Sequence, residues 1–463
     1  MENVNVEIGV RTREKALELA TDAPFRVAIL GDFSGRANRK SGGAPRPIEI
    51  DPGNFEEVMQ RLNVALELPA GPLKFAELDD FHPDQLYQNV PLFASLREAK
   101  TQPAEFRPAP ASPSRPAPPP TAAGSLLDQI VGQAAPEAAR TSAPSENAWD
   151  QTIRDIARKH ATPEPDPRQQ QARALLDQTA AAQMRAILSH PDFQALEAAW
   201  RSLFFFFRYV ETGPDLHVEL IDIAQHELRQ KLPELQRIFA DRAPGEPRWS
   251  VLTGLYTFSA CEDDCALLAR LGALARMAGA PFLAGVDARL FGCESIAAAP
   301  DPDDWHLPID EEHQQAWQRL RQSEDASWIG LAFPRFLLRL PYGKKTSPID
   351  SFDFEEMPGE PAHDGYLWGN PAIACACLLG QEFNREQWEM RARSMARLDG
   401  IPLHTPPDRE ATPPAEIWMT ERFAGQIAEA GVMPLASVRH SDAVLLVRFQ
   451  SIADPAQPLA GPW

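Results

Sequence analysis

The sequence predicts an α/β protein in which mixed sheets are flanked by helices. Short apolar runs typical of buried strands recur along the 463 residues, and amphipathic or alanine-rich helical segments separate them. A further observation concerns residues 103–120, where eight prolines stand among alanines and serines. Such a composition forms an extended linker without a core, so it marks the clearest predicted boundary between domains.

A small module is predicted before this linker, over residues 23–101. Residues 1–22 precede it as a tether that carries one isolated strand. The expected elements of the module are a strand at 25–29, a helix from Phe55 to Leu62 that Asn54 begins, a strand at 73–75 and a helix that begins at Pro83.

A larger module is predicted after the linker. The linker itself is assigned to residues 102–123, a helical region follows at 124–180, and the larger module occupies 181–463. An alanine-rich helix is expected at 167–189, and a helix at 263–278 should end at Gly279, because Pro281 follows closely. The other expected elements are strands at 217–223, 249–258, 282–286, 328–333 and 444–449, and a helix at 371–383.

The most informative single segment is Ile187 to Phe207. Ser189 and Pro191 indicate the start of a helix, with the Ser189 hydroxyl as its cap. Glu197 and Arg201 are expected to form a supporting ion pair away from the apolar stripe. The periodicity alone is typical of an ordinary core helix, and a helix that is buried against another chain would show the same pattern. The stripe comprises five large apolar side chains at steps of three and four residues, namely Phe193, Leu196, Trp200, Leu203 and Phe207.

Composition excludes several classes of function. The formal charge of −20 and the pI near 5.0 disfavour binding to nucleic acid or to an anionic membrane. The first ten residues show no cationic and apolar signal sequence, and no apolar run is long enough to span a membrane. Five cysteines without a signal sequence fit a reducing compartment. We therefore expect a cytoplasmic protein.

Two short segments near the N-terminus and after the linker have the pattern of partner-binding elements. Val4, Val6, Ile8 and Val10 alternate with Asn5, Glu7 and Gly9, as in a half-buried strand that could complete the sheet of another molecule. A frayed terminus is the alternative. A short helix from Ser125 to Ala134 could enter a groove or pack on its own domain. Its apolar stripe comprises Leu126, Leu127, Ile130 and Val131.

No catalytic or metal-binding constellation can be assembled from the sequence. Asp79–Asp80 and Glu355–Glu356 are adjacent carboxylates, which predict surface or interface roles because neighbouring strand residues point to opposite faces. Cys261 and Cys265 lie four residues apart without a nearby histidine, which argues against zinc. We therefore expect no enzymatic activity, no cofactor and no bound metal.

Short sequence motifs in both modules resemble those of one protein family. HPDFQALEAAWRSL at residues 190–203 closely resembles a motif in the large subunit of the type VI secretion contractile sheath. The N-terminal module is similar to the small subunit of the same sheath, through residues 31–36, 78–84 and 90–97. Further motifs follow in the same order along the chain as in the large-subunit family, at residues 321–325, 333–343, 352–356, 366–371, 416–417 and 450–451.

The resemblance implies a structural protein in which a small-subunit-like module is fused ahead of a large-subunit-like module and packs against it. Such a protein would form a cytoplasmic sheath around an inner tube and would contact other sheath subunits. The implied partners also include the baseplate and a hexameric unfoldase that would capture the Ser125–Ala134 helix. Residues expected to hold the modules together are Phe193, Trp200, Arg201, Arg335, Arg339, Tyr366 and Trp368.

An alternative of a different class stays open. The same fold could serve a non-polymerising accessory protein, or an adaptor at the sheath end or the baseplate. The sequence ends soon after Gln450 and Ser451, where the large-subunit family normally continues, whereas Val4–Val10 resembles the family's donor strand. These features lead to the expectation of a subunit that donates a strand but lacks the segment that would accept one.

Overall fold

The computed structural model describes residues 23–40, 42–101, 167–241, 247–299, 301–305, 310–392, 394–406 and 409–463. The predicted strand at Val4–Val10, the linker and the predicted helix at Ser125–Ala134 lie outside these residues. The chain divides into two compact units, Met1–Ala94 with Asp177–Trp463 and Ser95–Leu176. The sheet and the residue clusters described below lie in the first unit.

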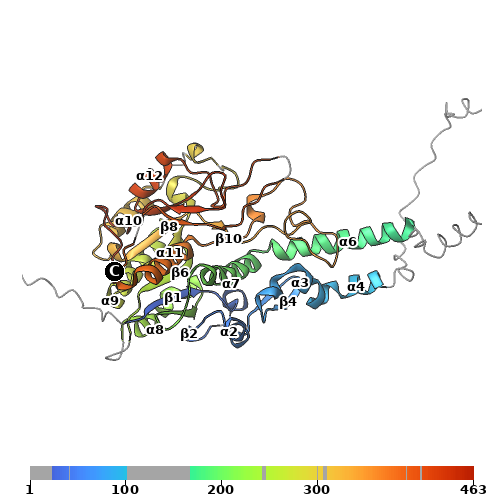
Figure 1. The fold of residues 1–463 in the computed structure, drawn as a ribbon, viewed down its shortest axis with the longest axis horizontal. Coiled ribbons are helices and arrows are strands. Elements are labelled where there is room, and N and C mark those ends of the chain that lie inside the picture. The colour runs from blue at the N-terminus through green and yellow to red at the C-terminus, as the bar shows by residue number, and fades with distance from the viewer. Residues whose placement is uncertain are drawn as a thin grey trace, which may run out of the picture. The chain divides into compact units, whose positions relative to one another are not determined.

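A nine-stranded sheet forms the centre of the first unit (Figure 1). Its strands lie in the order β11-β13-β12-β8-β7-β6-β1-β5-β2, and the six strands from β12 to β5 are parallel. The antiparallel strands β2, β13 and β11 complete the two sides. The strand bounds are β1 Phe25–Gly31, β2 Pro47–Glu49, β5 Leu216–Asp222, β6 Val251–Phe258, β7 Phe282–Val286, β8 Ile329–Phe333, β11 Ala396–Leu398, β12 Val432–Ser437 and β13 Val444–Leu446.

Two further pairs of short strands lie outside this sheet, β3 Ala65–Leu68 with β4 Gly71–Lys74 and β9 Phe336–Leu337 with β10 Trp368–Gly369. The described α-helices are α1 Arg36–Arg39, α2 Phe55–Leu62, α3 Pro83–Asn89, α4 Ala94–Thr101, α6 Pro167–Leu188, α7 Pro191–Tyr209, α8 Leu228–Phe239, α9 Glu262–Ala278, α10 Glu311–Arg321, α11 Pro371–Glu386 and α12 Glu421–Glu429.

Strand β1 comes from the N-terminal module but lies between two strands of the C-terminal module. Phe25 is in register with Leu216 of β5, and Val27 is in register with Val251 of β6. All of its residues except Arg26 are buried, as expected of a central parallel strand that is covered on both faces. Residues of the two predicted modules therefore share one sheet.

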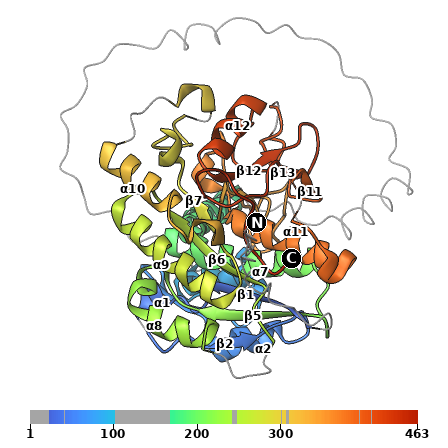
Figure 2. The same cartoon turned by 90° about the vertical axis from the view of Figure 1, so that its left-hand side faces the viewer.

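Helices cover both faces of the sheet (Figure 2). Ala28 and Leu30 of β1 point into a core that α8, α9, α10 and α12 complete. On the opposite face, Phe25 stacks on Phe383 of α11 with ring centroids 4.8 Å apart. The small side chains in the first half of α11 allow this helix to lie close to the strands, and Gly380 allows it to approach Val210 after α7. The predicted α/β fold is confirmed.

Most of the expected elements are present, with ends shifted by a few residues. Helix α9 ends at Gly279, as predicted, and the glycine adopts a left-handed φ of 71°. The predicted Ser189 cap is wrong, because His190 is the residue before α7 and its Nδ1 accepts a hydrogen bond from the Asp192 N–H at 3.3 Å. The described helices α1, α4, α8, α10 and α12 and the strands β2, β3, β9, β10, β11 and β12 were not predicted.

Candidate functional site

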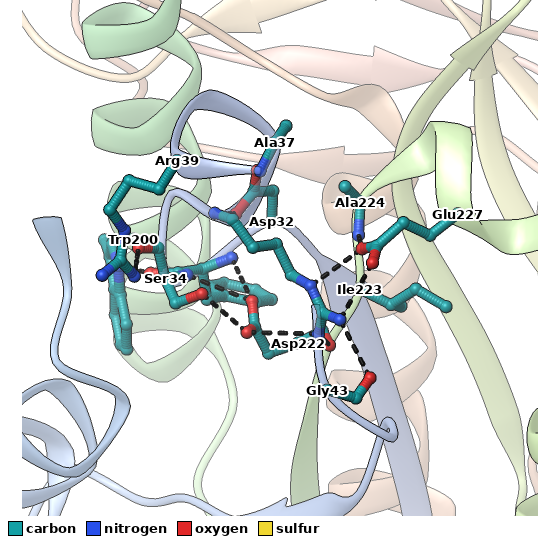
Figure 3. Close-up of polar contacts among 12 residues, drawn as sticks. Asp32, Ser34, Ala37, Arg39, Gly43, Trp200, Asp222, Ile223, Ala224 and Glu227 are labelled. Carbon is teal, nitrogen blue, oxygen red and sulfur yellow. Dashed lines mark hydrogen bonds and ion pairs between the residues drawn. The ribbon is translucent and has the colours of Figure 1, made fainter. Parts of the chain in front are cut away.

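The loop that leaves β1 forms a network with the end of β5, which we name the strand-exit cluster (Asp32, Ser34, Arg36, Asp222 and Glu227). Figure 3 shows Asp32, Ser34, Asp222 and Glu227 of this cluster close to one another. The Asp222 carboxylate accepts hydrogen bonds from the backbone N–H of Phe33 at 2.9 Å and of Ser34 at 3.1 Å. Its second oxygen accepts from the Ser34 hydroxyl at 2.8 Å. Asp222 therefore fixes the chain immediately after β1.

Arg36 is the cation at the centre of this cluster, and it is buried. Its Nε lies 2.8 Å from Glu227 Oε2, and its guanidinium also donates to the carbonyl oxygens of Gly43 and Asp222. The Asp32 carboxylate accepts from the backbone N–H groups of Arg36 at 2.7 Å and Ala37 at 2.8 Å. Burial, with a further contribution from the charge of Asp222, raises the pKa of Asp32. This cluster joins the N-terminal segment to β5 and the turn that follows it.

Helix α7 packs its predicted stripe on the N-terminal segment. The fully buried indole of Trp200 donates its Nε1–H to the Phe33 carbonyl at 2.8 Å, and its ring meets Phe33 and Phe55 edge-on. Phe193 packs in the same way against Phe75 and Phe81, which stack with centroids 4.1 Å apart. Both residues thus bury aromatic surface contributed by the segment before the linker.

A second network joins α7 to the segment around Arg339, and we name it the α7 charge cluster (Glu197, Arg201, Arg339, Tyr342 and Glu356). The side chain of Glu197 is 0% exposed and accepts from Arg201 Nε at 2.6 Å and Arg339 Nε at 2.8 Å. Arg339 also bonds both oxygens of Glu356, and its guanidinium lies 4.3 Å from the ring centroid of Tyr342. Two buried carboxylates thus share one buried guanidinium.

Electrostatics in the α7 charge cluster favour ionised side chains. Burial opposes ionisation of Glu197, but Arg339 and Arg201 outweigh it and lower the pKa of this carboxyl below its ordinary value. Burial also opposes the charge on Arg339, yet Glu197 and Glu356 raise its pKa well above the usual range. Burial raises the pKa of Tyr342 to about 12. The cluster is therefore a fixed ionic connection between α7 and the segment around Arg339.

The remaining predicted packing residues gather elsewhere, around Glu416. Arg335 donates from its backbone N–H and from Nε to this carboxylate, both at 2.9 Å, and His363 Nε2 lies 3.0 Å from it. Burial opposes ionisation of Glu416, but Arg335 and His363 lower its pKa to about 2. Trp368 donates to the His363 carbonyl at 3.0 Å, and the Tyr366 hydroxyl lies 2.7 Å from His404 Nδ1.

The structure thus separates the seven predicted packing residues into two groups. Phe193, Trp200, Arg201 and Arg339 lie on or against α7, whereas Arg335, Tyr366 and Trp368 surround the Glu416 site. The other predicted partner residues, at Val4–Val10 and Leu126–Val131, lie outside the described residues. That the seven residues hold the two modules together remains a proposal.

Comparison with known proteins identifies the family. A family model described as "EvpB/VC_A0108, tail sheath N-terminal domain" matches residues 170–453, more than half of the chain. The chain belongs to this tail sheath family. A second model, "Type VI secretion system, VipA, VC_A0107 or Hcp2", matches residues 2–109. The resemblance of both segments to type VI sheath proteins is therefore confirmed.

One curated sheath protein matches over a long stretch. The type VI secretion system sheath protein TssC1 of Pseudomonas aeruginosa is 32% identical over 305 residues. The match covers 61% of this chain, and the chain spans only about 61% of the length of TssC1. In the part of this chain that the structure describes, no helix is long and apolar enough to cross a membrane.

The predicted ion pair of Glu197 with Arg201 is confirmed, at 2.6 Å, but Glu197 is also fully buried, between Arg201 and Arg339. Surface or interface roles were predicted for Glu355 and Glu356. Only 6% of the Glu356 side chain is exposed and Arg339 binds it, which excludes the surface alternative for Glu356. The sequence analysis also missed Arg36, Asp222 and Glu227. The one sequence feature that could have indicated a role for Arg36 is its position at the end of the Gly31–Arg36 motif, directly after a buried strand.

Proposed function

We propose that this chain is a structural subunit of a type VI contractile sheath in which small- and large-subunit segments are fused. The observation that carries the proposal is the position of β1 between β5 and β6. The matches to a small-subunit and a large-subunit family model within one chain support it further. The fusion would supply, in a single polypeptide, the strand and the aromatic contacts that complete the large-subunit sheet.

The contacts of the N-terminal segment support an integral role in the fold. Strand β1 is hydrogen bonded on both sides, and its side chains enter the cores on both faces of the sheet. The strand-exit cluster and the Trp200 indole then hold the chain beyond β1. Removing this segment would leave two parallel strands with unpaired edges and an open apolar core.

The proposal extends to location and partners. A cytoplasmic sheath of this kind would surround an inner tube, contact neighbouring sheath subunits and start from a baseplate. The strand predicted at Val4–Val10 would enter a sheet of a neighbouring subunit. The helix predicted at Ser125–Ala134 would be captured by a hexameric unfoldase. The TssC1 match supports the sheath role, because its name assigns that protein to the sheath. No catalytic step is part of the proposal.

Electron microscopy of the purified full-length protein, alone and mixed with a sheath protein that carries an acceptor segment, tests the proposal. A subunit that donates a strand without accepting one should give hollow tubes of regular diameter only in the mixture. Discrete monomers or dimers under both conditions would contradict a sheath subunit and favour the accessory or adaptor alternative. The substitutions Val6→Asp and Ile8→Asp should stop tube growth, whereas Asn5→Asp, on the other face of the predicted strand, should preserve it.

A further inference from the structure

A groove with an aromatic floor lies between α2 and the C-terminal half of α7, and we name it the aromatic groove. Its volume is about 480 Å³. Phe55 meets Phe204 edge-on at a centroid distance of 6.4 Å and Phe207 at 6.3 Å. Phe204 keeps 47% of its surface exposed and is the one aromatic residue among the exposed large hydrophobic side chains of the described residues. The fold leaves this ring surface accessible.

Carboxylates line the rim of the aromatic groove. Glu56 belongs to the first turn of α2, and Glu77 and Asp79 come from the segment after β4. All three are exposed, and within the described residues no ion pair neutralises them. The neighbouring charge of Asp80, together with partial desolvation and the charge of Glu56, raises the pKa of Glu77. The rim is therefore a site of uncompensated negative charge.

The cation that lines the groove does not remove this charge. Arg208 contributes to the wall, but its guanidinium lies 5.7 Å from the ring centroid of Tyr209. In the described part of the chain, no ion pair joins Arg208 to the rim carboxylates. A groove lined by both aromatic rings and carboxylates is an environment that accommodates a flat cation with an apolar stem.

We propose that the aromatic groove docks a segment of a partner protein that presents an arginine beside an apolar residue. The guanidinium would lie over Phe204 and form hydrogen bonds with the rim carboxylates, while the neighbouring apolar side chain would cover Phe207. Arginine fits better than lysine, because its planar group stacks on a ring and binds a carboxylate through two hydrogen bonds at once. This inference does not depend on the proposed sheath function.

An array of immobilised hexapeptides tests the inference with the full-length protein. Each peptide carries an arginine between two apolar residues, and a matched peptide carries citrulline, which keeps the shape but lacks the charge. The strongest binder is then measured in solution by fluorescence polarisation. We expect at least tenfold weaker binding of the citrulline form, and weaker binding of the arginine form at high salt.

Matched variants locate the binding site. Phe204→Ala and Glu56→Gln should each weaken binding of the arginine peptide at least fivefold. Met277→Ala removes an exposed apolar side chain from α9, and Glu57→Gln removes the neighbouring charge of α2 that does not line the groove; neither should change binding. Equal binding of arginine and citrulline peptides, the absence of any arginine binder, or unchanged binding by Phe204→Ala would each overturn the inference.

Discussion

Replacing Arg339 with methionine would break the α7 charge cluster while keeping much of the volume of the side chain. The guanidinium of Arg339 makes two contacts to Glu197, at 2.8 and 3.2 Å, and two to Glu356, at 2.8 and 3.0 Å. Only 9% of the Arg339 side chain is exposed, so solvent cannot replace it. Arg339→Met therefore leaves two buried carboxylates that have lost their shared counter-ion.

Removing one partner of a buried ion pair typically costs about 3–5 kcal/mol of unfolding free energy. Glu197 retains Arg201 Nε at 2.6 Å, and Glu356 retains the backbone N–H of Tyr342 at 2.7 Å. These remaining contacts place the expected loss in the lower part of that range, at about 3 kcal/mol. The same substitution at Arg422, whose exposed side chain pairs with exposed Asp303, should cost less than about 1 kcal/mol.

The pH dependence of the loss tests its electrostatic origin. The pKa of Glu197 is lowered in the fold, so its ionised form stabilises the protein above the ordinary carboxyl pKa, and this stabilisation is lost as the pH falls. In Arg339→Met the carboxyl can take up a proton more easily. The difference in unfolding free energy between the two proteins, measured by urea titration of tryptophan fluorescence, should therefore be smaller at pH 4 than at pH 7. An equal deficit at both values would refute the reasoning.

Three further predictions concern separate parts of the chain. Glu416→Gln should reduce stability at pH 7 and flatten the fall in stability between pH 5 and pH 2, because the native carboxyl has its pKa lowered to about 2; thermal unfolding across this range measures it. Gly380→Ala should cost about 1–3 kcal/mol, since its Cβ would lie 2.7 Å from Val210 Cγ1, whereas Gly425→Ala in open space on α12 should gain up to about 1 kcal/mol. Leu127→Asp with Ile130→Asp should abolish capture by a sheath unfoldase in a pull-down without lowering the melting temperature, and a lower melting temperature would instead favour packing of this segment on its own domain.

Local patterns in the sequence predicted individual elements well. The short apolar run Phe25–Ile29, interrupted only by Arg26, predicted β1, and the combination of Gly279 and Pro281 predicted the end of α9. The elements that were missed have weaker local signals. Helix α8 contains Pro233 in its interior, and β11 has only three residues. Their stability depends on packing against α9 and on pairing with β13, and neither contact can be inferred from a short window of sequence.

The candidate site was less predictable, because it depends on contacts between residues far apart in the chain. The sequence predicts Glu197 as a partner of Arg201 away from the apolar stripe, and only Arg339, which lies 142 residues later, explains why it is buried. The pairing of β1 with β5 and β6 also depends on residues far apart in the chain, since no local pattern specifies which strands will flank it. By contrast, the spacing of Phe193 and Trp200 correctly predicted that both are buried, because helical periodicity is a local property.

The position of β1 imposes an order of events on biosynthesis. Phe25 pairs with Leu216, and Val27 with Val251, so the ribosome must add about 190 residues before the first neighbour of β1 exists and about 225 before both do. At roughly 5–20 residues per second, this delay is on the order of 10–45 s. During that time a nascent apolar strand has no sheet to join and is exposed to wrong pairing. The first of the described strands to be made thus lies inside the finished sheet and finds both of its partners only long after its own synthesis.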